Sequence, residues 1–190
     1  ILDFGGVRGL VIAEQGSGSL LSGFTITNTA TSENGGAILL KGAADAQLVD
    51  LHILGARATK GGAIYLTTGD LTLDGVTIRD AMAAQGGGAL YNQAGTVTAD
   101  AVTVGRAEAE RFGGAVYNGS LGDLSLINTV VYSGTSGADG GAIYNAGSLW
   151  LWNDTLVSNA AADAGGAIYD EGQQAVTVRN TLIVSNRADA

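Results

Sequence analysis

The phrase Gly-Gly-Ala followed by an aliphatic residue occurs six times in the chain, and it starts at Gly35, Gly61, Gly87, Gly113, Gly140 and Gly165. Successive copies start 26, 26, 26, 27 and 25 residues apart. A nearly constant period of this length is typical of an array, in which each repeat is one structural unit that stacks on the next. The repeat therefore constrains the fold more strongly than any local propensity does.

Two further apolar stretches recur within each unit, and both alternate apolar with polar residues. One unit holds Leu71-Thr-Leu73 and then Val76-Thr-Ile78. With the stretch after the glycines they give three short strands per repeat, which leaves no room for a helix of about ten residues. Such chains close into a solenoid in which each strand pairs in parallel with its counterpart one coil on. We predict an all-β parallel β-helix, a single-stranded solenoid of about seven coils of roughly 26 residues, with residues 1–190 as one domain.

Inward positions of a solenoid face the same position in the coils above and below. The residue after each Gly-Gly-Ala phrase is expected to form a core column of this kind, made of Ile38, Ile64, Leu90, Val116, Ile143 and Ile168. The next residue is a tyrosine in five coils, namely Tyr65, Tyr91, Tyr117, Tyr144 and Tyr169. Alternation predicts that these rings face outward as a stacked ladder. If the alanines point inward instead, the tyrosines fill the core.

Asparagine or aspartate follows the tyrosine at Asn92, Asn118, Asn145 and Asp170. Asparagine tolerates a left-handed backbone, and its amide can bond to the next amide along the axis, so a structural ladder at a sharp bend is expected here. A second set is expected to open the bend between the two later strands, at Asn128, Asn153 and Asn180. The repeated glycines supply positive φ or room for a close backbone approach.

The charge and composition exclude several classes of function. The formal net charge is −9, and no basic stripe is present to meet phosphates, which argues against binding nucleic acid or an anionic membrane surface. No apolar run approaches the roughly 18 residues of a membrane-spanning helix. One histidine and no cysteine exclude a zinc site. No cofactor is predicted beyond adventitious Ca²⁺ near the glycine pairs. Because the chain begins with Ile1, we interpret it as an excised or processed part of a longer protein.

The Gly-Gly-Ala-Ile copies at residues 35–38, 61–64, 140–143 and 165–168 resemble the GGAI motif of chlamydial-type polymorphic outer-membrane proteins. More broadly, residues 140–172 resemble the right-handed parallel β-helix repeats of large bacterial surface and secreted proteins. The companion Phe-x-x-Asn motif survives only with an aliphatic in place of Phe, at residues 156–159 and 183–186, so the wider family is the better match. The resemblance implies exported adhesins, autotransporter passengers and matrix proteins, and also some polysaccharide lyases and hydrolases.

Carboxylates that could serve a glycan-cleaving β-helix lie near one bend, at Asp74, Asp100 and Asp154. Such enzymes need acids clustered on one outward face, as an acid/base pair or as Ca²⁺ ligands. These acids do not keep one register, so solvated turn charges are the preferred interpretation and no catalytic residue is predicted. The only histidine, His52, alternates outward and takes the place that threonines have in neighbouring coils.

Trp150 and Trp152 alternate with Leu149 and Leu151, so both indoles are expected to face outward, close to the tyrosine ladder. An exposed aromatic patch can stack on sugar rings or on another protein, and its alternative role is local packing against the next coil. The candidate binding residues are therefore Trp150, Trp152, Tyr91, Tyr117 and Tyr144.

Two functions are compatible with these features. The preferred one is a non-enzymatic, extracellular or cell-surface structural or adhesive module, whose partners are other surface proteins, glycans or further copies stacked end to end into fibres. The alternative is a polysaccharide-active or glycan-binding β-helix. Fold alone does not separate them, because parallel β-helices host all these activities.

Overall fold

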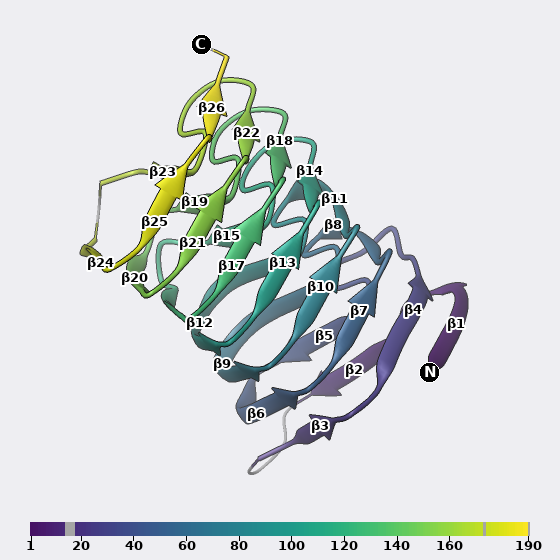
Figure 1. Cartoon of the computed structure of the whole chain (residues 1–190). Helices are drawn as coiled ribbons and strands as arrows, with labels where there is room; N and C mark the ends of the chain where they lie inside the picture. Colours follow the sequence, from purple (N-terminus) through teal and green to yellow (C-terminus); the bar gives the residue numbers. More distant parts are fainter. Residues whose placement is uncertain (14–17, 173, 190) are drawn as a thin grey trace.

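The computed structural model describes residues 1–13, 18–172 and 174–189. Within them the regular secondary structure is all β-strand, and the strands form three parallel sheets that wind about seven times, with about 26 residues per turn. In Figure 1 the colour runs from purple at one end of the solenoid to yellow at the other, so neighbours along the axis are one coil apart in sequence. The predicted parallel solenoid is confirmed.

Sheet A contains the stretch that alternates as Val76-Thr-Ile78. Thr77 pairs in parallel with His52 one coil before and with Thr103 one coil after. The strands of this sheet lie in chain order along the axis: β1 (Leu2–Val7), β4 (Thr25–Thr29), β7 (His52–Leu54), β10 (Thr77–Arg79), β13 (Thr103–Gly105), β17 (Val130–Tyr132), β21 (Thr155–Val157) and β25 (Leu182–Val184).

Sheet B contains both the segment after the glycines and the Leu71-Thr-Leu73 stretch. In two coils these segments form one long strand, and elsewhere they are separate strands of the same sheet. The strands after the glycines, or in the equivalent position of the first coil, are β2 (Leu10–Ala13), β5 (Ile38–Lys41), β9 (Ile64–Asp74), β12 (Leu90–Asp100), β15 (Val116–Asn118), β19 (Ile143–Asn145) and β23 (Ile168–Asp170). The separate second segments are β3 (Leu20–Ser22), β6 (Ala43–Val49), β16 (Asp123–Ile127), β20 (Ser148–Trp152) and β24 (Val176–Arg179).

Sheet C is made of short strands, and all but the last come shortly before a glycine pair: β8 (Arg57–Lys60), β11 (Met82–Gly86), β14 (Glu108–Ala109), β18 (Thr135–Ser136), β22 (Ala160–Ala161) and β26 (Arg187–Ala188). The number of strands per coil agrees with the prediction, but their grouping differs. The segment after the glycines and the Leu71-Thr-Leu73 stretch, which were predicted as separate strands, both belong to sheet B. The third sheet is formed by residues in which large apolar side chains do not alternate with polar ones. Its inward side chains are small, as at Ala83, Ala109 and Ser136, so the apolar pattern is weak there.

The core runs along the axis between the three sheets. Ile38, Ile64, Leu90, Val116 and Ile143 are buried in one contiguous cluster, and Ile168 is partly buried against it. Consecutive members pair in register, as Ile64 does with Leu90 and Leu90 with Val116. The predicted core column is confirmed.

The two glycines of each pair serve different steric needs. The first has a left-handed backbone, with φ of +62° at Gly87. The second permits close stacking, because a Cβ on Gly88 would lie 2.3 Å from the carbonyl oxygen of Gly114 in the next coil. Both expected reasons for glycine are therefore present, one at each position.

The bends carry further left-handed residues, and they divide the two sets of asparagines. Asn128, Asn153 and Asn180 have φ of 50°, 60° and 46°, as predicted for the bend between sheets B and A. Asn92 and Asn118 do not have positive φ; they end or continue extended strands. The expectation of left-handed backbone at the first set is wrong, because its asparagines are held by side-chain bonds inside the solenoid.

Candidate functional site

The tyrosines after the core column form a continuous stack. Neighbouring ring centroids are 5.2, 4.3, 5.0 and 5.1 Å apart, in the order Tyr65, Tyr91, Tyr117, Tyr144 and Tyr169. Interplanar angles of 5° to 24° make these contacts stacked rather than edge-to-face. Strand register produces the ladder, because Tyr91 pairs directly with Tyr65 and with Tyr117.

The ladder lies outside the main core, yet it does not form a solvent-exposed face. Leu39, Tyr65 and Tyr91 form a second apolar cluster with Tyr117 packed against it, and Tyr91 is only 9% exposed. The outward direction predicted by alternation therefore holds, whereas broad exposure to solvent does not. Burial, followed by the neighbouring Tyr117, raises the pKa of Tyr91. Its phenol therefore stays protonated and uncharged at neutral pH.

A buried amide ladder runs beside the tyrosines. The Nδ2 group of Asn92 donates to Oδ1 of Asn118 at 2.9 Å, and Asn118 donates to Asn145 at 2.9 Å. Asn145 donates in turn to Oδ1 of Asp170 at 2.7 Å. The predicted axial bonding is present, and because the three asparagines are fully buried, this ladder is structural and offers no ligand site.

Trp150 and Trp152 project from β20, and each is 47% exposed, while Leu149 and Leu151 between and beside them are buried. The predicted orientation of the indoles is thus confirmed. The guanidinium of Arg179 lies 5.6 Å from the ring centroid of Trp152. Among the described residues the ring contacts of the tyrosine ladder include neither indole, so the tryptophans and tyrosines are two separate aromatic surfaces.

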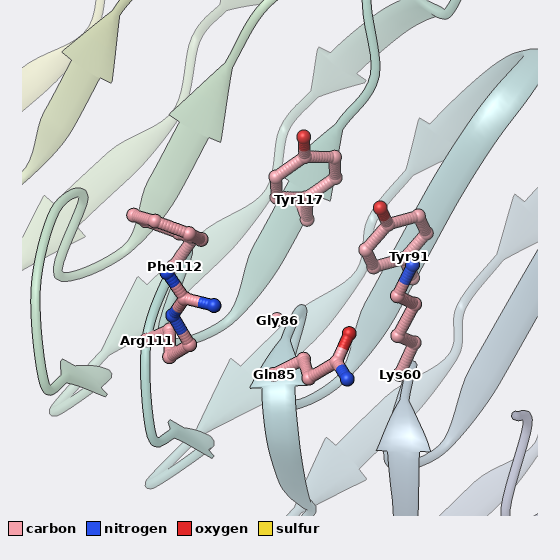
Figure 2. Close-up of a pocket in the computed structure, with 7 residues that line it drawn as sticks. All are labelled: Lys60, Gln85, Gly86, Tyr91, Arg111, Phe112 and Tyr117. Atoms are coloured by element: carbon pink, nitrogen blue, oxygen red, sulfur yellow. The ribbon is translucent and has the colours of Figure 1, made fainter. Parts of the chain in front are cut away.

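A hollow of about 160 Å³ lies against the ladder where sheet C turns into sheet B. Its lining comes from three consecutive coils: Lys60, Gln85, Gly86, Tyr91, Arg111, Phe112 and Tyr117. Figure 2 shows Lys60 and Arg111 on opposite sides of Gly86, with Gln85 between them. The Nζ of Lys60 is 5.1 Å from the Tyr91 ring centroid, and Cζ of Arg111 is 4.9 Å from that of Phe112. Two cations and three aromatic rings thus converge on one small space.

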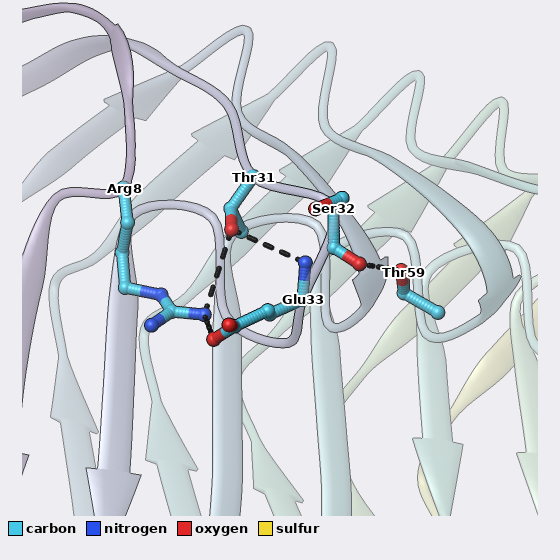
Figure 3. A network of polar contacts seen from close by, with 5 residues as sticks. All are labelled: Arg8, Thr31, Ser32, Glu33 and Thr59. Atoms are coloured by element: carbon cyan, nitrogen blue, oxygen red, sulfur yellow. Dashed lines mark hydrogen bonds and ion pairs between the residues drawn. The ribbon is translucent and has the colours of Figure 1, made fainter.

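A second hollow, of about 440 Å³, lies farther toward the N-terminus and is lined by Arg8, Glu33, Asn34, Leu39, Lys41, Tyr65 and Thr67. Here the arginine is neutralised, because its Nη2 contacts Oε2 of Glu33 at 2.6 Å (Figure 3). This bond, followed by the positive charge of Arg8, lowers the pKa of Glu33. Thr31 accepts from the backbone N–H of Glu33 at 3.2 Å and steadies the turn. The charge of Arg8 in this hollow is therefore balanced by Glu33, although Nε of Arg8 is buried without a hydrogen-bond partner among the described residues.

Two of the three acids considered for catalysis are neighbours in the sheet, so the expectation that these acids do not keep one register is wrong for Asp74 and Asp100. Asp74 and Asp100 pair in register at the ends of β9 and β12, but Asp100 is bonded by the amide of Asn128 at 2.9 Å. Asp154 lies inside the bend, where its carboxylate accepts from the backbone N–H groups of Thr129 and Trp152 at 2.7 and 2.8 Å. Burial, only partly offset by these two bonds, raises the pKa of Asp154. Asp154 therefore has a structural role, because its carboxylate satisfies two backbone N–H groups of the bend.

Other groups in the described ranges carry no assembled chemistry. His52 is an exposed residue of β7 beside Thr77, as expected. No three His, Cys, Asp or Glu side chains lie together as a metal site in the part of the chain that the structure describes. In residues 1–13, 18–172 and 174–189, none of the elements is a helix long and apolar enough to cross a membrane.

Sequence reasoning found the tyrosines and tryptophans but missed Lys60, Gln85 and Arg111 as neighbours of the ladder. They precede the glycine pairs, in the connections that became sheet C. One signal was available in the sequence: residues 86–88 read Gly-Gly-Gly, so the position that is Lys60 one coil before has no side chain.

Comparison of the chain with protein-family models, with curated proteins and with solved structures found no match. The parallel β-solenoid is therefore established by the strand pairing of the chain itself, and the resemblance of its Gly-Gly-Ala phrases to bacterial surface repeats stays a prediction.

Proposed function

We propose that the chain is a non-enzymatic structural and adhesive module of an extracellular or cell-surface protein. The observation that carries this proposal is the regular register of its coils. From β9 to β24 the second segments of sheet B pair residue for residue with their counterparts one coil on. A solenoid with so regular a register holds its side faces at a fixed spacing, as a spacer or a display surface requires.

Apolar side chains at the last described coil support an end-to-end version of this role. Val176 is 39% exposed, whereas its register partner Leu149 in the coil before is 0% exposed. Ile183 is also exposed, and its partner Leu156 is buried. A further coil in the same register would cover both residues. In the fibre form of the proposal, that coil belongs to a second copy of the chain.

Surface labelling tests the proposed location and role. An antibody raised against residues 1–190 is applied to intact source cells and to their culture medium, with and without permeabilisation. We expect signal on intact cells or in the medium, and we expect external protease to remove the cell-bound signal. Signal that requires permeabilisation would contradict the proposal. The fibre form is tested separately by sedimentation velocity: the proportion of assembled species should rise with concentration, and a single monomer across the range would rule out end-to-end stacking.

Glycan binding is a second candidate, and the exposed indoles favour it. Trp150 and Trp152 lie two residues apart on one face of β20, at a spacing of about 7 Å that is similar to the size of a sugar ring. Binding to a panel of acidic and neutral polysaccharides, with and without Ca²⁺, is measured for the wild type, for Trp150→Ala and for Leu121→Ala, which removes an exposed apolar side chain elsewhere. Loss of binding in Trp150→Ala alone would support a lectin-like role. Bond cleavage that disappears in Asp74→Asn or Asp100→Asn would instead indicate an enzyme.

A further inference from the structure

The hollow between Lys60 and Arg111 exists because one column of side chains is interrupted. Gly86 pairs with Lys60 in the coil before and with Phe112 in the coil after. Asn34 precedes Lys60 in the same column. The side chains of Lys60 and Phe112 lie against rings of the tyrosine ladder, whereas Gly86 has no side chain and leaves a hollow lined by Tyr91 and Tyr117 (Figure 2).

The constraint on Gly86 is weaker than that on its two neighbours. Gly87 needs its left-handed φ of +62°, and Gly88 has no room for a Cβ. The φ of Gly86 is not positive, and a Cβ would lie 3.0 Å from the Phe112 carbonyl oxygen and 3.4 Å from the Tyr117 ring. The first contact is tight, so a side chain here requires a shift of a few tenths of an ångström in the neighbouring backbone. The absence of a side chain at Gly86 leaves the hollow open.

The cations that border this space lack carboxylate partners. Among the described residues the ion pairs join Arg8 to Glu33, Arg106 to Asp80 and Arg187 to Asp189, and none includes Lys60 or Arg111. None of the described residues that line the hollow is an aspartate or glutamate, and Oδ1 of Asp139, which lies farther along the axis, accepts from the backbone N–H of Ala164 at 3.1 Å. In a chain of net charge −9, two unpaired cations facing one hollow form a local exception.

We propose that the hollow formed by Lys60, Gln85, Gly86 and Arg111 binds a small ligand that carries a carboxylate on a single six-membered ring. Lys60 and Arg111 approach the carboxylate from opposite sides, and the Gln85 amide supplies a further neutral donor. Charge-assisted hydrogen bonds of this kind are stronger than neutral ones, and arginine can bind a carboxylate through two N–H groups.

The size and walls of the hollow set the rest of the ligand. A cavity of about 150 Å³ holds one benzene molecule. At about 160 Å³, this hollow accepts one ring but not a chain of rings within it. The edges of Phe112 and Tyr117 supply apolar contact for the ring. Because burial raises the pKa of Tyr91 and of Tyr117, these phenols add no negative charge that would oppose an anion. The inference does not depend on the structural role proposed above.

Binding is tested by calorimetry and by NMR chemical shifts, with sodium benzoate, sodium glucuronate, sodium acetate and sodium sulfate as probes. We expect benzoate or glucuronate to bind at least tenfold more tightly than acetate and sulfate, and the difference between the two rings shows whether the walls prefer an aromatic or a sugar ring. Ring carboxylates that bind no better than acetate or sulfate would overturn the proposal.

Variants place the site on the molecule. Lys60→Met and Arg111→Met should each weaken binding of the better probe about tenfold, and Gly86→Asn should abolish it by filling the hollow. Arg79→Met is the matched control, because it removes an exposed cation of sheet A that does not line the hollow. An equal loss in Arg79→Met, or full binding in Lys60→Met and Arg111→Met, would overturn the proposal. Circular dichroism verifies folding, and the two methionine variants decide the outcome if Gly86→Asn does not fold.

Discussion

Replacing Asn118 by alanine should destabilise the solenoid far more than the loss of an ordinary surface amide. Its Oδ1 accepts from Asn92, and its Nδ2 group donates to Asn145, Gly122 and Ser148 at 2.9, 3.2 and 3.0 Å. Two N–H protons shared by three acceptors, plus one accepted bond, amount to about three full hydrogen bonds. At about 1 kcal/mol net for each, and with buried partners left unsatisfied, the loss is about 3 to 4 kcal/mol. That is a large part of the roughly 5 to 15 kcal/mol typical of a domain.

Urea unfolding followed by fluorescence measures this loss, with Asn128→Gly as the control. Asn128 belongs to the exposed set of asparagines, and glycine keeps its left-handed backbone, so the control should change the free energy of unfolding by only about 0.5 kcal/mol. Asn118→Asp adds a second comparison. It places a carboxylate against the three oxygens that Asn118 Nδ2 contacts, so at neutral pH it should be less stable than the alanine variant, and acid should reduce that difference. An Asn118→Ala loss no larger than that of Asn128→Gly would refute the reasoning.

Three other outcomes are expected. Gly88→Ala should prevent folding or lower the melting temperature sharply, because its Cβ would lie 2.3 Å from a carbonyl oxygen of the next coil, whereas Gly86→Ala should lower it less, because its Cβ would lie 3.0 Å from the Phe112 carbonyl oxygen; similar melting of both variants would contradict the steric argument. Because the folded chain raises the pKa of Asp154, this group's contribution to stability is full below its ordinary pKa of 3.8 and is lost as the pH rises through the raised value. The stability of the wild type relative to Asp154→Asn, measured in urea at several pH values, should therefore fall with rising pH, and a constant difference would disprove the assignment. Arg106→Gln should let the pKa of Asp80 rise toward its ordinary value, as NMR titration would show, while leaving stability almost unchanged because the pair is exposed and screened by solvent; an unmoved Asp80 titration would exclude the ion pair.

The parts of the fold that the sequence predicts best are those dictated by axial repetition. A period near 26 residues places Ile64 against Leu90 and Tyr91 against Tyr117 without further information. The steric need for glycine at Gly88 has the same origin, because its Cβ would meet the Gly114 carbonyl oxygen one coil on. These features follow from the chain's own neighbours one coil away, so a repeat read in the sequence is sufficient to predict them.

The parts that were missed depend on contacts across a bend. Sheet C escaped recognition because its inward residues, such as Ala83 and Ala109, are too small to stand out from polar neighbours. The burial of the tyrosine ladder was missed for a related reason: Lys60 lies in sheet C and Phe112 in the connection between sheets C and B, and their side chains cover rings that alternation alone places in solvent. Alternation predicts the direction in which a side chain points. Whether other side chains cover it there depends on the tertiary structure.

Because the strands of all three sheets pair in parallel with the next coil, the length of the solenoid changes by whole coils. Removing residues 87–112 would join Gly86 to Gly113, and Gly113 already stands one coil away in the same position as Gly87. The core column would close on residues of like kind, as Ile64 would on Val116, and the rod would shorten by about 4.8 Å. Duplication of one coil would lengthen it equally. Recombination between repeats of the gene can therefore change the length of the solenoid while keeping the core column continuous.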